Sequence, residues 1–115
     1  MNFRPGLATK VMAGEKTVTR RLVSDNPRSP WWREKCALVV GRDYAVCPGR
    51  GKVAIGRVVV RSVRFEELVP EAQLTDEEAR REGFADAAEF AREFAAINSP
   101  LPRRIEVWRI EFERA

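Results

Sequence analysis

The first apolar positions of the chain recur at the spacing of a helix. Leu7 and Val11 are four residues apart, so they lie on one side of a helical segment. Pro5 suits the first helical turn, and Gly14 suits the position just past a helix end. The pattern predicts a short helix over residues 5–13.

Two further helices are predicted in the second half of the chain. Thr75 precedes a run of acidic residues and suits an N-cap, with Glu78 at the capping-box position, so a helix is expected to reach Glu82 and to end at Gly83. Asp86 suits the cap of the next helix.

That next helix is expected over residues 87–96. Phe90, Phe94 and Ile97 recur within it at helical spacing, and such a set of side chains is typical of a core-facing side.

Strands are predicted where β-branched and aromatic residues cluster between turn signals. They cover residues 17–21, 36–40, 43–47, 53–63 and 105–112. The helices are too few and too clustered for alternating βαβ units. We therefore expect an α+β domain with a mostly antiparallel sheet, curled into a small β-barrel with short helices against it.

Composition limits the classes of function. The chain of 115 residues, 44% of them apolar and 33% charged, is expected to form a single globular domain spanning residues 1–115. It has no apolar run of the roughly 20 residues that a membrane helix needs. Its first residues lack the order of a secretory signal, so we expect a cytoplasmic protein without a membrane partner.

Two cysteines and the absence of histidine narrow the chemistry further. The cysteines do not form a Cys-x-x-Cys pair, so we expect no metal site, no cofactor and no disulfide. Any catalysis has to use other groups, such as lysine, threonine or carboxylates. The net charge of +4 suits a polyanionic partner.

The segment of residues 14–21 is the most unusual part of the chain. It holds a lysine, two threonines and two arginines within six consecutive positions, and as a strand it has no apolar face. It is either a solvated edge strand or the wall of a ligand pocket. Lys16 and Thr19 differ in parity, so they can meet only if Lys16 lies in the turn before the strand or a β-bulge intervenes, and we expect the strand to begin after Lys16.

Two polar segments carry candidate contact residues. The loop of residues 24–35 contains Trp31 and Trp32, which either pack on the core or stack on a flat ligand. The turn of residues 48–52 has Arg50 and Lys52 at its tip, where they form either a plain hairpin end or a phosphate contact.

The sequence from Gly14 to Arg20 matches the Gly-x-Lys-x-x-x-Arg signature of ASCH domains. The preceding helix, the turn of residues 48–52, the segment of residues 78–84 and the closing strand also resemble ASCH proteins. Nearly the whole chain takes part in the resemblance, which implies the fold of the PUA-like β-barrels.

The resemblance also implies binding of RNA, or of a nucleoside or nucleotide, in a basic cleft beside the barrel. The residues that would line this cleft or its rim are Lys16, Thr19, Arg20, Arg21, Arg50, Lys52 and Trp32. The oligomeric state stays open.

Some ASCH proteins are instead regarded as ribonucleases, and a small bacterial group hydrolyses the amide of N(4)-acetylcytidine. Carried over to this chain, the catalytic lysine, threonine and glutamate of that group fall on Lys16, Thr19 and Glu82. Thr19 would be the nucleophile, Lys16 a base with a lowered pKa, and Glu82 a proton shuttle or orienting group. The alternative for Glu82 is a solvent-facing carboxylate on the helix.

Overall fold

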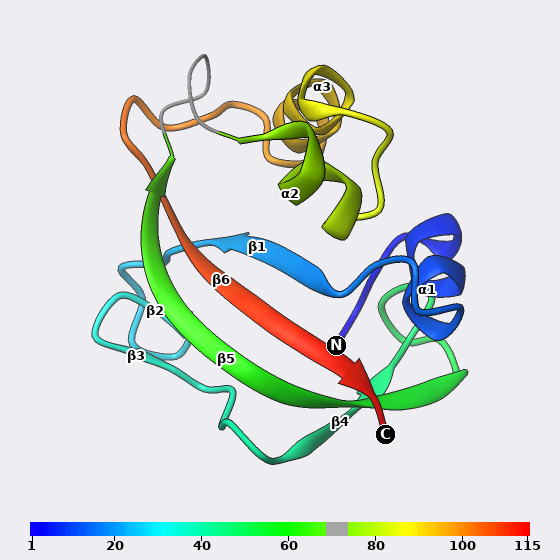
Figure 1. Cartoon of the computed structure of the whole chain (residues 1–115). Helices are drawn as coiled ribbons and strands as arrows, with labels where there is room; N and C mark the ends of the chain where they lie inside the picture. The colour runs from blue at the N-terminus through cyan, green and yellow to red at the C-terminus, as the bar shows by residue number, and fades with distance from the viewer. Residues whose placement is uncertain (69–73) are drawn as a thin grey trace.

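The computed structural model describes residues 1–68 and 74–115 (Figure 1). Its helices and strands are, in chain order, α1 (Pro5–Met12), β1 (Val18–Leu22), β2 (Trp31–Trp32), β3 (Lys35–Cys36), β4 (Asp43–Val46), β5 (Gly56–Leu68), α2 (Asp76–Arg81), α3 (Ala87–Ile97) and β6 (Ile105–Arg114).

The main sheet has four strands in the order β1-β6-β5-β4, and all neighbours are antiparallel. β2 and β3 form a separate small hairpin. The prediction of an α+β fold with an antiparallel sheet is thus confirmed. The predicted barrel is not confirmed, because over residues 1–68 and 74–115 the sheet is open, with β1 and β4 at its edges.

The strand predicted over residues 53–63 is displaced along the chain. β5 begins at Gly56 and continues to Leu68, which pairs with Ile105 at the far end of β6. This long pairing with β6 extends the strand beyond its valine-rich part. Val53 precedes β5 and is largely exposed.

The strand predicted over residues 36–40 is also wrong for most of its length. Only Cys36 is in a strand, where it pairs with Trp31 across the β2–β3 hairpin. Val39 and Val40 are exposed in the loop before β4. An apolar run without a neighbouring strand to pair with stays irregular in this fold.

The helices follow the predicted boundaries within one residue at either end. The Thr75 hydroxyl accepts from the Glu78 backbone N–H at 3.1 Å, as expected of an N-cap. Gly83, at φ +95°, ends the helical segment in the left-handed region that favours glycine. The Glu78 side chain does not complete a capping box, because its carboxylate binds arginines of the sheet instead.

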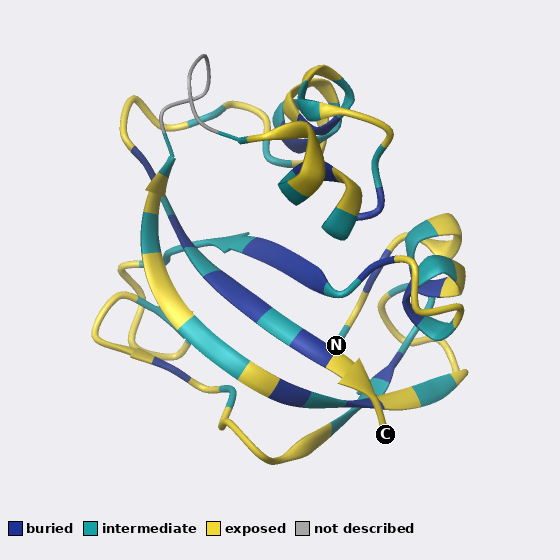
Figure 2. Ribbon diagram, viewed as in Figure 1, coloured by how far each residue is buried: buried dark blue, intermediate teal, exposed yellow. Residues whose placement is uncertain are grey.

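Two apolar clusters lie on opposite faces of the sheet. Ile110 and Phe112 of β6 pack with α1, whereas Ile105 and Val107 pack with α2 and α3. Buried and intermediate residues therefore follow one another along β6 until its exposed end, as Figure 2 shows. Within the described residues, no helix is long and apolar enough to cross a membrane.

Candidate functional site

Lys16 lies in the turn between α1 and β1. β1 begins at Val18, so the expectation that Lys16 precedes the strand is confirmed. Its ammonium nitrogen Nζ donates to Val18 O at 2.7 Å, to Glu82 O at 2.7 Å and to Glu82 Oε1 at 2.9 Å. These three bonds use every donor of an ammonium group, so the arrangement suits the charged form of lysine.

Glu82 is the C-cap residue of α2, and its side chain is only 3% exposed. One carboxylate oxygen binds Lys16, while the other lies 2.9 Å from Nη1 of Arg20. Of the two alternatives for Glu82, the solvent-facing helix carboxylate is thus wrong. A buried carboxylate held by one cation on each oxygen has a fixed position.

Arg20 is also tied to residues outside this pair. It lies directly opposite Arg109 in the β1–β6 register, and both guanidinium groups donate to Oε1 of Glu78 at 2.7 Å. Its Nε donates to Glu66 of β5 at 2.8 Å. The carboxylate of Glu78 therefore joins two like charges on adjacent strands and fixes α2 to the sheet.

Burial and charge shift the proton affinities of this cluster. Burial lowers the pKa of Lys16, and the Glu82 carboxylate partly opposes that shift. Burial tends to raise the pKa of Glu78, but hydrogen bonds from Arg109 and Arg20 outweigh it and lower that pKa to about 2. Glu78 is therefore ionised at neutral pH.

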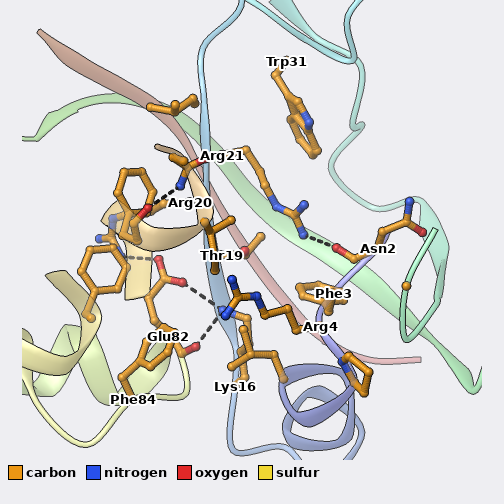
Figure 3. Close-up of a pocket in the computed structure, with 18 of the residues that line it drawn as sticks. Asn2, Phe3, Arg4, Lys16, Thr19, Arg20, Arg21, Trp31, Glu82 and Phe84 are labelled. Atoms are coloured by element: carbon orange, nitrogen blue, oxygen red, sulfur yellow. Dashed lines mark hydrogen bonds and ion pairs between the residues drawn. The ribbon is translucent and has the colours of Figure 1, made fainter. Parts of the chain in front are cut away.

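A cavity of about 560 Å³ opens beside this cluster (Figure 3). Lys16, Thr19 and Glu82 lie around it in the close-up, and Trp31 and Phe84 lie at opposite ends of it in this view. Its wall is formed by Asn2, Phe3, Arg4, Pro5, Leu7, Lys16, Thr19, Arg20, Arg21, Leu22, Trp31, Gly49, Arg50, Glu82, Phe84, Phe90, Phe94, Ile97 and Asn98.

The structure brings most of the candidate site residues to this cavity. Those in its wall are Lys16, Thr19, Arg20, Arg21, Arg50 and Glu82. Lys52 and Trp32 do not line it. The sequence analysis assigned Trp32 to the rim of the cleft, whereas its neighbour Trp31 lines the cavity, because nothing in an adjacent pair of tryptophans indicates which one turns inward.

Thr19 is nearly buried, at 5% exposure, yet its hydroxyl is not sealed off. Among the described residues the hydroxyl has no hydrogen-bond partner. Every fully buried side-chain oxygen or nitrogen atom in that part of the chain does have a partner, so the Thr19 hydroxyl is not fully buried. The Thr19 oxygen is thus accessible from the cavity, where it is free to bind or attack a ligand.

Arg21 lies at the end of the cavity formed by the N-terminal segment. Its guanidinium carbon is 5.1 Å from the centre of the Phe3 ring and 5.5 Å from that of Trp31, and Nη2 donates to Asn2 O at 2.7 Å. In the part of the chain that is described, no carboxylate pairs with Arg21. Its charge is therefore available to an anionic ligand.

Metal binding has no support in the same residues. Over residues 1–68 and 74–115, no group of three or more cysteine and carboxylate side chains is placed to hold a metal ion. The acidic residues near the cavity are instead paired with arginines and with Lys16.

The solved structures with the same fold include two bacterial proteins. A protein from Enterococcus faecalis V583, described by the family model DUF984, has a TM-score of 0.61 and 16% identity, with coverage of 96% of this chain and 70% of that chain. An ASCH domain from Lactobacillus crispatus JV V101 has a TM-score of 0.59 and 19% identity, with coverage of 95% of this chain and 70% of that chain.

No family model and no curated protein matches the sequence. The structural matches nevertheless agree with the ASCH resemblance of the sequence. The chain has the fold of an ASCH domain.

Proposed function

We propose that this protein binds a nucleoside or nucleotide, free or within RNA, in the cavity beside β1. The main observation behind the proposal is that buried polar side chains and aromatic side chains line the same cavity. Lys16, Thr19 and Glu82 form a buried polar part, and aromatic side chains such as Trp31 and Phe84 form an apolar part. The volume of about 560 Å³ lies in the range of small-molecule pockets.

The two parts match the two parts of a nucleotide. Aromatic rings offer surfaces for base stacking, which is worth about 1–3 kcal/mol per base. Arg21 and Arg50, both in the wall, are suited to phosphate. In the polar part, Lys16 and Glu82 bind each other, so the Thr19 hydroxyl is left for a hydrogen bond to the base or ribose.

Calorimetric titration tests the proposal with cytidine 5′-monophosphate and with a short single-stranded RNA. We expect both to bind at low salt, and we expect RNA binding to weaken with a log–log slope of about −0.7 per phosphate contact. If neither ligand binds at low salt, the proposal is wrong.

A second candidate function is hydrolysis of N(4)-acetylcytidine, favoured by the position of Lys16, Thr19 and Glu82 in one cavity wall and by a Thr19 hydroxyl that has no partner among the described residues. The Thr19 oxygen would attack the acetyl carbonyl carbon while its proton passes to neutral Lys16. Lys16 would return that proton to the departing cytidine nitrogen, and water would then release acetate from Thr19.

This second function requires a neutral Lys16 amine during the reaction, and burial lowers the pKa of Lys16 in that direction. Incubation with N(4)-acetylcytidine followed by chromatography provides the test. We expect cytidine from the wild type and none from Thr19→Val, which keeps the side-chain volume. Equal cytidine from both proteins would exclude the mechanism.

A further inference from the structure

The cavity runs along the free edge of β1. Thr19 and Arg21 have side chains on one face of the sheet, and Arg20 and Leu22 have theirs on the other, yet all four line the cavity. A single cavity contacts residues of both faces only along the edge of their strand. β1 is an edge strand of the sheet, with β6 on its other side.

Hydrogen bonds at the two ends of β1 show which of its residues bond to β6. Phe112 N–H donates to Thr17 O and Val23 N–H donates to Glu106 O, each at 2.9 Å and in the register of the β1–β6 pair. Since bonded and non-bonded pairs alternate along an antiparallel ladder, the odd-numbered residues of β1 bond to β6.

The even-numbered residues consequently direct their backbone groups away from β6. Val18 agrees with this assignment, because its carbonyl accepts from Lys16 Nζ on the cavity side. Arg20 N–H, Arg20 C=O and Leu22 N–H have no hydrogen-bond partner among the described residues. They form a row of donor, acceptor and donor along the cavity wall.

We propose that this edge of β1 binds the Watson–Crick edge of a nucleobase, with Arg20 N–H and C=O as its paired donor and acceptor. The inference rests on the proposed function and adds how the ligand is recognised. Every nucleobase has a donor beside an acceptor on that edge, which complements the backbone of one strand residue. The cavity volume of about 560 Å³ lies in the range of small-molecule pockets, which suits a nucleotide.

Amide hydrogen exchange of the ligand-free protein tests whether the backbone N–H groups of Arg20 and Leu22 are free of hydrogen bonds. We expect the amides of Arg20 and Leu22 to exchange at least about 10-fold faster than those of Thr19 and Arg21, which bond to β6. Equal protection of the four amides would mean that the edge is not free, and the inference would be wrong whatever the protein binds.

Saturation with cytidine 5′-monophosphate tests the recognition itself. We expect the Arg20 amide to be protected at least about 10-fold and its NMR signal to shift, with little change at Arg21. If the ligand shifts signals of Trp31 and Phe84 but leaves Arg20 and Leu22 unchanged, the inference is wrong and the proposed function stands. If no signal shifts, both are wrong.

Changes to the ligand and to the strand provide an independent test. The N4,N4-dimethyl analogue of cytidine 5′-monophosphate, which lacks the base donor, should bind at least about 10-fold more weakly, while the 5-methyl analogue should bind normally. Leu22→Pro removes an N–H that faces the cavity and spares the ladder. Leu22→Pro should therefore bind cytidine 5′-monophosphate more weakly than Leu22→Ala does. Equal affinities of the wild type for the unmodified nucleotide and both analogues would contradict the proposal.

Discussion

Lys16 and Glu82 are 66 positions apart in the sequence, yet their side chains form a 2.9 Å ion pair that is almost wholly buried. The pair joins the turn before β1 to the end of α2. Arg20 of β1 binds the second oxygen of the Glu82 carboxylate at 2.9 Å. Three elements thus meet at one carboxylate, which defines the polar wall of the cavity.

Replacement of that carboxylate should be strongly destabilising. Glu82→Gln leaves Lys16 and Arg20 without their shared anion in a buried site, and loss of one partner of a buried ion pair costs about 3–5 kcal/mol. Urea unfolding measures the change. The matched control is Glu77→Gln, an exposed carboxylate in the same helix, which should leave the unfolding midpoint unchanged.

Glu78 should make stability depend on pH in the acidic range. Its pKa is about 2 in the folded protein, against an ordinary value of 4.5, so its contribution is fully present above about pH 4.5 and is lost as the pH falls toward 2. Glu78→Gln should therefore be less stable than the wild type at pH 7. The difference between the two proteins should shrink between pH 4.5 and 2, and a constant difference would argue against an ionised bridge to Arg20 and Arg109.

The two adjacent tryptophans should differ in their effect on ligand binding. Trp31 lines the cavity and Trp32 does not, although the backbone oxygens of both accept from Trp108 Nε1 and survive substitution. Trp31→Ala should weaken binding of cytidine 5′-monophosphate by about 10-fold, the value of one stacking contact. Trp32→Ala should leave the affinity nearly unchanged, and an equal loss in both would contradict the assigned cavity wall.

Glycine substitutions should separate backbone strain from helix propensity. Gly83 has φ +95° beside Glu82, so Gly83→Ala should destabilise the protein by about 1–2 kcal/mol. Gly6 lies in α1 with open space around its Cα, and Gly6→Ala should stabilise by up to about 1 kcal/mol. Thermal unfolding of the two variants should show melting temperatures that move in opposite directions.

Local patterns predicted most of the elements correctly. The caps and periodicity around Thr75 and Asp86 predicted α2 and α3, and the parity of Lys16 and Thr19 predicted where β1 begins. These features depend on contacts within a few residues. The length of β5 and the irregular segment at Val39 depend on which strands pair, and no local pattern contains that information.

The site was predictable only as far as local sequence patterns indicated its residues. The ASCH-like motif indicated Lys16, Thr19 and Glu82, which the fold brings to one cavity. The bridge from Arg20 through Glu78 to Arg109 was not foreseen, because the three residues come from three separate elements. The sequence of α2 suggested a capping role for Glu78, and the two sheet arginines override it.

A crystal structure of the protein grown with cytidine 5′-monophosphate tests the central claim most directly. The account predicts electron density for the nucleotide inside the cavity, with the base along Arg20 of β1 and the phosphate toward Arg21 or Arg50. Density only on the outer surface, for example beside Lys52 and Trp32, or an unchanged cavity at saturating ligand, would contradict it.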